Sequence, residues 1–91
     1  MFGWRLVRVE GDSMKPVLDP GTYGVFRHRQ IYRDGDIVLI DHPTYGAIIK
    51  RIRNQTPQGF WLVGENDASL TTSQLGLVPQ SCILGRLAFT V

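Results

Sequence analysis

The sequence lacks several features on which whole classes of protein depend. Its 91 residues contain one cysteine, Cys82, so no intrachain disulfide can form and we expect a reducing compartment. One cysteine and two separated histidines, His28 and His42, do not predict a zinc site. No apolar run reaches the roughly 18 to 20 residues of a membrane-spanning helix, and Arg5 and Arg8 interrupt the segment where a signal peptide would be apolar. We therefore expect a cytoplasmic protein without metal, cofactor or membrane segment.

A strong excess of one charge is also missing, because the net charge is only +2. The hydrophobic fraction of 43% and the charged fraction of 20% are typical of a globular protein and not of a disordered one. The length predicts a single domain over residues 1–91. The one basic cluster comprises Arg27, His28, Arg29 and Arg33. We interpret it as a solvated loop and expect no nucleic-acid partner, since no recognition helix accompanies it.

Short apolar runs separated by turn residues predict an all-β protein. They are rich in β-branched and aromatic residues and cover residues 4–9, 22–26, 36–40, 47–53, 60–63 and 83–91. The loop at 54–59 predicts a hairpin between its neighbouring strands. No convincing helix is predicted beyond a single turn at residues 14–18. Six such strands indicate an antiparallel sheet curled into a small barrel.

A serine and a lysine stand out as candidate catalytic residues. Ser13 directly follows Gly11-Asp12, a pair typical of a tight turn, and Lys50 lies in the strand predicted over residues 47–53. Strand alternation places Ile48, Lys50 and Ile52 on one face. Burial between two isoleucines disfavours the ammonium form and lowers the lysine pKa, which is what a general base for a serine nucleophile requires.

Each candidate has a structural alternative. Ser13 alone could be a turn or N-cap serine, and Lys50 could be a solvated lysine whose stem covers its isoleucine neighbours. Met14 could fill the core, line a substrate cleft, or both. His42, adjacent to Asp41, invites a Ser/His/Asp interpretation, which we disfavour because neighbouring strand residues point to opposite faces.

The residues resemble a known family. The segment VEGDSMKPVL, residues 9–18, resembles the serine box of the signal peptidase I family, and DGDIVLI, IIKRI, GEND, Ser69, Gly76 and ILGR follow in the family's order. The resemblance implies a fold of the type shared by signal peptidases and the C-terminal domains of SOS-response repressors. It further implies a Ser/Lys dyad of Ser13 and Lys50, with Ser69 supporting the lysine.

Other roles are expected from the turn chemistry and the resemblance together. The turn built by Gly11 and Asp12 should expose the backbone N–H of Ser13 as an oxyanion donor. Gly11 stands where some family members supply a serine hydroxyl. The resemblance implies an extended substrate beside residues 8–12 and the strand leading to Lys50. We predict substrate contacts from Gly11, Asp12, Met14 and Ile48.

Two departures from the family pattern narrow the functional expectation. The chain shows neither the membrane-spanning segments nor the long insertion after Lys-Arg of typical signal peptidases, and Leu70-Thr71-Thr72-Ser73 replaces the usual Asp-Ser-Arg. This short form is similar to nickel-type superoxide dismutase maturation proteases. The similarity implies an endopeptidase that removes an N-terminal propeptide or leader from a partner, with nickel superoxide dismutase precursor as the named candidate.

Two alternatives remain beside a peptidase that acts on a partner. The first is a self-cleaving regulatory domain, which is disfavoured because the sequence has no helical DNA-binding domain, no upstream linker and no Ala-Gly bond of the kind such domains cut. The second is an inactive β-barrel binding module, whose main support is the departure at Thr71-Thr72-Ser73.

Overall fold

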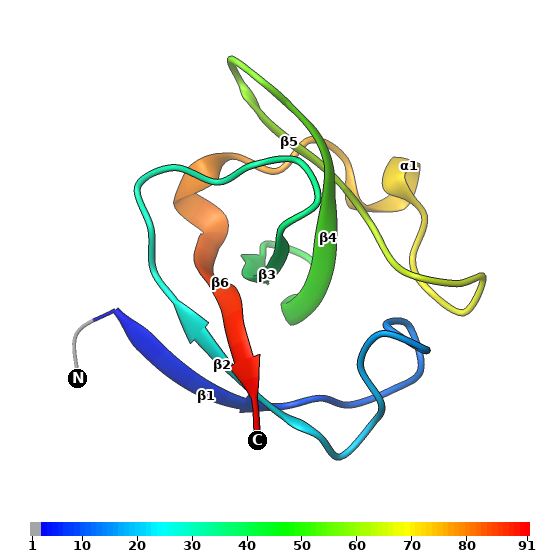
Figure 1. Ribbon diagram of the computed structural model, residues 1–91. Coiled ribbons are helices and arrows are strands. Elements are labelled where there is room, and N and C mark those ends of the chain that lie inside the picture. The colour runs from blue at the N-terminus through cyan, green and yellow to red at the C-terminus, as the bar shows by residue number, and fades with distance from the viewer. Residues whose placement is uncertain (1–2) are drawn as a thin grey trace.

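The computed structural model describes residues 3–91, and these form an all-β structure (Figure 1). In chain order the elements are β1 (Trp4–Arg8), β2 (Tyr23–Arg27), β3 (Ile37–His42), β4 (Gly46–Thr56), β5 (Gly59–Val63), α1 (Thr72–Leu75), the 3-10 helix η1 (Gln80–Cys82) and β6 (Ile83–Thr90). The six strands form one sheet in the order β1-β2-β6-β3-β4-β5, and every neighbouring pair is antiparallel. The all-β class predicted from the sequence is therefore confirmed.

The sheet curls but does not close. Its end strands are β1 and β5, and within residues 3–91 these two strands do not pair with each other. The register shifts between β2 and β6, between β3 and β6, and between β4 and β5. Such bulges bend a strand and increase its twist, so the sheet wraps around its apolar contents.

Most of the predicted strand pairing is present. The predicted hairpin joins β4 to β5, and Thr56 pairs with Gly59 across a turn made of Pro57 and Gln58. Strand β4 is longer than expected because it continues through the polar residues Asn54 and Gln55. Their backbones pair with β5, and backbone pairing does not require an apolar side chain.

Two short helices were not predicted. Helix α1 begins with a capping box in which the Thr71 hydroxyl accepts from the Gln74 N–H and the Gln74 side chain accepts from the Thr71 N–H. Its last residue, Leu75, is buried. A helix of four residues is too short to show a helical period, so apolar patterning could not reveal it. Residues 14–18 form the single turn expected there, closed by a Leu18 N–H to Met14 C=O bond of 2.8 Å, and it does not extend into a helix.

Buried apolar residues form two separate groups. The larger one, here called the main core, consists of Tyr32, Val38, Ile40, Ile52, Phe60, Leu62, Leu75, Val78 and Ile83. The smaller one, the small core, consists of Val9, Met14 and Leu18, with Ile37, Ile49 and Leu87 packed against it. Strand β4 contributes to both, because Ile52 faces the main core and Ile49 the small core.

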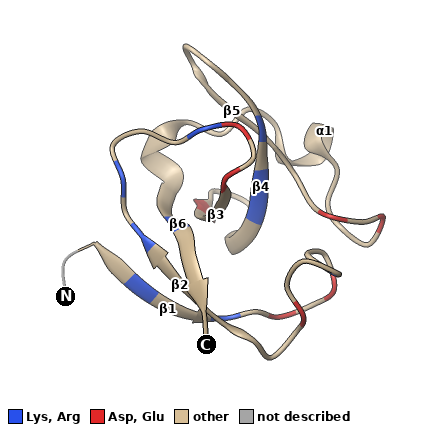
Figure 2. Ribbon diagram, in the orientation of Figure 1, with Lys and Arg blue, Asp and Glu red and all other residues tan. Residues whose placement is uncertain are grey.

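Charge is distributed unevenly over the elements. Figure 2 shows basic segments on β1, β2 and β4, acidic segments on the loops that follow β1 and β5, and segments of both kinds on the loop between β2 and β3. Within residues 3–91, no helix has the length and apolar character needed to cross a membrane.

Candidate active site

Lys50 lies in the middle of β4 on the face that the alternation predicted. It is opposite Val38 of β3, and its strand neighbours on the same face, Ile48 and Ile52, pack in or against the main core. Only 2% of Lys50 is exposed to solvent. This burial lowers the pKa of Lys50 from its ordinary value, because a low-dielectric surrounding disfavours the ammonium form.

Ser69 binds the Lys50 amine. The Lys50 Nζ donates a hydrogen bond to the Ser69 Oγ, and the Ser69 hydroxyl donates to the Leu70 carbonyl at 3.2 Å. With its own proton directed to Leu70, the Ser69 oxygen presents a lone pair to Lys50. A neutral amine held in this way keeps its own lone pair free for another proton.

Ser13 lies on the loop between β1 and β2. Two hydrogen bonds of 2.8 Å close this loop, from Val9 N–H to the Thr22 carbonyl and from Gly21 N–H to the Val9 carbonyl. Met14, the next residue, is buried in the small core and thereby anchors the loop. Within residues 3–91 no acceptor is assigned to the Ser13 N–H, which leaves that donor available for an oxyanion.

Ser13 and Lys50 line one pocket of about 320 Å3. Two of the predicted substrate contacts, Met14 and Ile48, also line it, together with Val7, Arg8, Val9, Glu10, Leu39, Ala47, Ile49, Ala68 and Leu70. The other two, Gly11 and Asp12, lie in the exposed turn before Ser13 and are not among the lining residues.

The described residues show no hydrogen bond between the Ser13 Oγ and the Lys50 Nζ. Catalytic hydrogen bonds are often long or poorly aligned until substrate closes the site, so this geometry does not remove either residue as a candidate.

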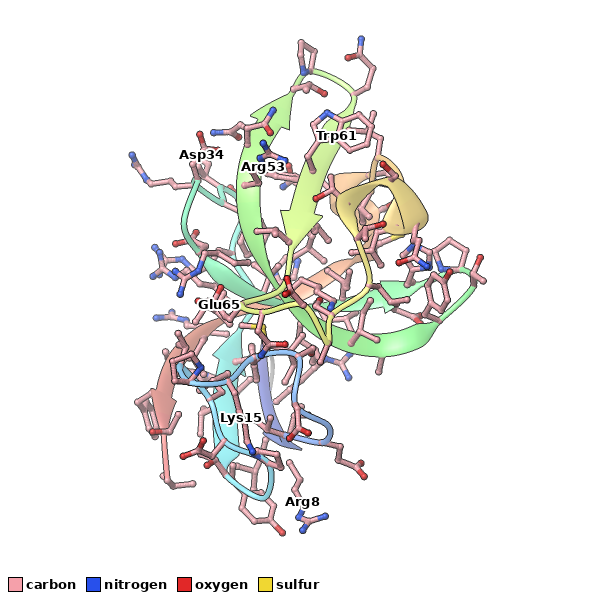
Figure 3. The ribbon with its side chains drawn as sticks, turned by 90° about the vertical axis from the view of Figure 1, so that its right-hand side faces the viewer. Arg8, Lys15, Asp34, Arg53, Trp61 and Glu65 are labelled. Atoms are coloured by element: carbon pink, nitrogen blue, oxygen red, sulfur yellow. The ribbon has the colours of Figure 1, made fainter. Side chains whose placement is uncertain are left out.

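The loop after β5 holds the Ser13 turn in place. The Glu65 N–H donates to the Ser13 carbonyl at 2.8 Å, and the Asn66 amide donates to the carbonyls of Asp12 and Lys15 at 2.6 and 2.9 Å. The Asn66 Oδ1 accepts from the Ala68 N–H, so both ends of its side chain are used. Figure 3 shows Glu65 between the part of the molecule that carries Lys15 and the part that carries Trp61.

Arg51 connects this loop to the strand of the lysine. Its guanidinium contacts both Glu65 carboxylate oxygens, at 2.8 and 3.1 Å, and also donates to the Gly35 carbonyl. The hydrogen bond to Glu65 raises the pKa of Arg51. Because Lys50 and Arg51 are consecutive residues of a strand, their side chains point to opposite faces. Lys50 lies on the face of the main core, and Arg51 holds the loop that supports Ser13.

A side chain at position 64 would disturb the support of Lys50. A Cβ placed on Gly64 would overlap the Ser69 hydroxyl and lie 3.1 Å from the Ser13 carbonyl oxygen. Gly64 therefore allows two site segments to approach closely.

The positioning roles of Glu65, Asn66, Arg51 and Gly64 were not predicted from the sequence. The motif Gly64-Glu65-Asn66-Asp67 was the one available indication, since Gly and Asn mark a turn. Nothing in that motif identifies which distant carbonyls the asparagine will bind.

His42 has a structural role. Its Nδ1 accepts from the backbone N–H groups of Thr44 and Tyr45 at 3.0 and 3.3 Å, and its Nε2 donates to the Leu75 carbonyl at 2.8 Å. This pattern describes a neutral ring with the proton on Nε2. Both ring nitrogens are occupied by the backbone, so His42 is not free to act on a serine.

The residues that depart from the family pattern build part of the scaffold. Thr71 caps α1, and the Thr72 hydroxyl donates to the Leu62 carbonyl at 2.9 Å. A neutral hydrogen bond from Thr72 thus attaches this segment to β5.

The described residues contain no group of three or more His, Cys, Asp or Glu side chains that could hold a metal ion. Cys82, a partly buried residue, is a free cysteine.

Comparison with known proteins is consistent with this geometry. Residues 4–86 match the family model described as Peptidase S24-like. A search of curated proteins returned no match.

Proposed function

The chain belongs to the Peptidase S24-like family, and from that premise we propose that it is a serine endopeptidase with Ser13 as nucleophile and Lys50 as general base. One observation carries the assignment of the base. Lys50 is buried, its pKa is lowered, and its amine is held by Ser69 at the pocket that Ser13 also lines. A lysine with only a structural role would need a carboxylate partner at this depth, and the structure gives it a neutral hydroxyl.

In the proposed acylation step, neutral Lys50 accepts the Ser13 hydroxyl proton while the Ser13 Oγ attacks a peptide carbonyl carbon. The Ser13 N–H donates to the oxyanion that forms. Collapse of this intermediate breaks the peptide C–N bond, and Lys50 returns the proton to the leaving amine. A water molecule then releases the acyl group by the same route, giving its proton to Lys50 and restoring the Ser13 hydroxyl.

We propose that the substrate is an N-terminal extension of a partner polypeptide. The pocket beside Ser13 is open, and no segment of residues 3–91 fills it, which supports cleavage of a separate chain. Its lining of mostly apolar residues, including Ala47 and Ala68, suits small apolar substrate side chains. The nickel superoxide dismutase precursor remains the specific candidate, and its support is the resemblance to short maturation proteases.

Self-cleavage is a second candidate function. The observation that favours it is the family match, because the resemblance noted above extends to the self-cleaving repressor domains. A self-cleaving protein would yield fragments of lower mass without added substrate, whereas a peptidase that acts on a separate chain would keep its own mass.

Intact-mass spectrometry of the purified protein, alone and with leader peptides that contain small residues before candidate bonds, tests these functions. We expect cleavage of an added peptide, which Ser13→Ala should abolish while the thermal midpoint changes little. The matched control is Ser81→Ala, an exposed serine of η1 outside the pocket. Cleavage that persists in Ser13→Ala would remove the nucleophile assignment, and a folded protein inactive on every peptide and on itself would favour a binding module.

A further inference from the structure

Four arginines from three strands and one loop line a second depression, here called the arginine pocket. Its volume is about 540 Å3, and the residues that matter for its chemistry are Arg27, Arg29, Arg51, Arg86, Trp4 and Asp36. In Figure 2, basic segments lie on β2 and on the loop after it. None of these six residues lines the Ser13–Lys50 pocket.

Three of the arginines have no carboxylate partner among residues 3–91. Arg51 is neutralised by Glu65, and the Asp36 carboxylate accepts the Arg33 backbone N–H at 2.9 Å. Arg27, Arg29 and Arg86 form no salt bridge within the described residues. The pocket thus presents an excess of positive charge even though Asp36 is part of its lining.

The sheet register places two of these arginines opposite each other. Arg27 of β2 pairs directly with Arg86 of β6, and like charges at directly opposed positions destabilise a sheet. An anion bound between them would remove that repulsion. Arginine forks also match the oxygens of a phosphate in pairs.

Trp4 adds an aromatic surface to the same pocket. It pairs with Arg27 across β1 and β2, and the Arg27 guanidinium carbon lies 5.1 Å from the ring centroid. Trp4 remains 38% exposed. Arginines that bind phosphates, next to an exposed aromatic ring on which a base can stack, are the combination found in sites for single-stranded nucleic acids.

We propose that the arginine pocket binds a nucleoside phosphate, with Arg27, Arg29 and Arg86 on the phosphate and Trp4 against the base. An acidic peptide would supply carboxylates for the arginines but nothing that needs the indole. The sequence alone led us to interpret residues 27–33 as a solvated loop. The tertiary structure changes that interpretation, because it brings Arg86 and Trp4 from the two ends of the chain to this loop.

Trp4 fluorescence tests the proposal directly. The experiment uses the Trp61→Phe variant so that Trp4 is the remaining tryptophan, and titrates it with adenosine triphosphate, a ten-residue oligodeoxythymidylate or hexaglutamate at constant ionic strength. We expect saturable quenching by a nucleoside phosphate. Arg86→Gln and Arg29→Gln should each weaken binding at least tenfold, whereas Arg53→Gln, an exposed arginine of β4 outside the pocket, should not.

Every outcome bears on the proposal. Binding of both the mononucleotide and the oligonucleotide would identify a free nucleotide as sufficient, and binding of the oligonucleotide alone would identify single-stranded nucleic acid. Absence of saturable quenching, equal binding of hexaglutamate, or equal weakening by Arg53→Gln would overturn it. Because the proposal does not involve Ser13 or Lys50, its failure would leave the peptidase proposal unaffected.

Discussion

Ser13 and Lys50 meet at one pocket but are held there by different means. Lys50 belongs to an interior strand of the sheet, paired with β3 on one side and β5 on the other, and Ile52 next to it on the same face lies in the main core. Ser13 belongs to a loop whose apolar anchor is the three-residue small core. The loop also depends on polar contacts from Glu65 and Asn66.

The base and the nucleophile need different kinds of support. A lysine stays neutral only while water is excluded from it, and exclusion requires a packed core. A nucleophile must remain accessible to substrate, so its loop is held through hydrogen bonds to backbone carbonyls and not through its own side chain. The base is thus held by packing in the main core, and the nucleophile by the small core together with hydrogen bonds from Glu65 and Asn66. The two forms of support can be broken separately.

The largest expected effect comes from replacing the base while keeping its charge. Lys50→Arg retains a cation on the core face, but a guanidinium stays protonated and cannot accept the Ser13 proton. We expect single-turnover cleavage to fall by about 10²- to 10⁴-fold, the usual contribution of a general base. The loss should be similar to that of Lys50→Ala, measured after both variants are shown to fold. An arginine variant that keeps most activity would leave Lys50 with a purely electrostatic role.

The pH dependence of cleavage and of stability tests whether burial controls the titration of Lys50. Cleavage should rise by about tenfold per pH unit below the Lys50 pKa and then level off, with its midpoint below that of an ordinary lysine. Stability should change in the same direction. Between the lowered folded pKa and the ordinary unfolded pKa, the unfolded chain binds one more proton, so stability increases as pH rises.

Rate profiles and denaturant midpoints over the same pH range check both statements. Lys50→Met serves as the control, because it should remove this part of the pH dependence of stability. An unchanged dependence in that variant would show that Lys50 is not the group that titrates.

Core truncations compare the two apolar groups directly. Ile52→Ala in the main core should cost about 2–5 kcal/mol of global unfolding free energy, as buried large-to-small changes do. Leu18→Ala in the small core removes a similar side chain, but we expect a smaller global loss and faster hydrogen exchange confined to residues 9–22. Urea unfolding together with amide exchange distinguishes the two. Equal global losses would mean that both groups unfold as one cooperative unit.

The smallest effect on global stability is expected from removing the hydrogen bonds that Asn66 donates to the Ser13 loop. Asn66→Ala deletes the donors to the Asp12 and Lys15 carbonyls, and each such bond contributes about 0.5–1.5 kcal/mol. The cleavage rate should fall clearly while the unfolding midpoint changes little, because the loop that carries Ser13 loses its position and the main core stays intact. The matched control is Asn54→Ala on β4, which is exposed and should change neither. A stability loss with unchanged cleavage would show that Asn66 does not position the nucleophile.

Several features of the fold and the site followed from local sequence pattern. Runs rich in β-branched and aromatic residues predicted the strands. Strand alternation placed Lys50 on the same face as Ile48 and Ile52, because side-chain direction in a strand has a period of two. Turn residues predicted the hairpin after β4. Helix α1 was missed since its Thr71 cap and four-residue length carry no period that a sequence pattern can reveal.

Local sequence pattern was enough to predict the all-β class, the face of Lys50 and the turn that exposes Ser13. The contacts that hold these residues in place, and the residues that surround them, depend on how the sheet and loops assemble. Asn66 binds carbonyls more than 50 positions away, and Arg27 faces Arg86 through strand order. The physical reason is that backbone carbonyls are the same in every residue and register is set by the whole sheet. Partners of that kind leave no mark in the local sequence.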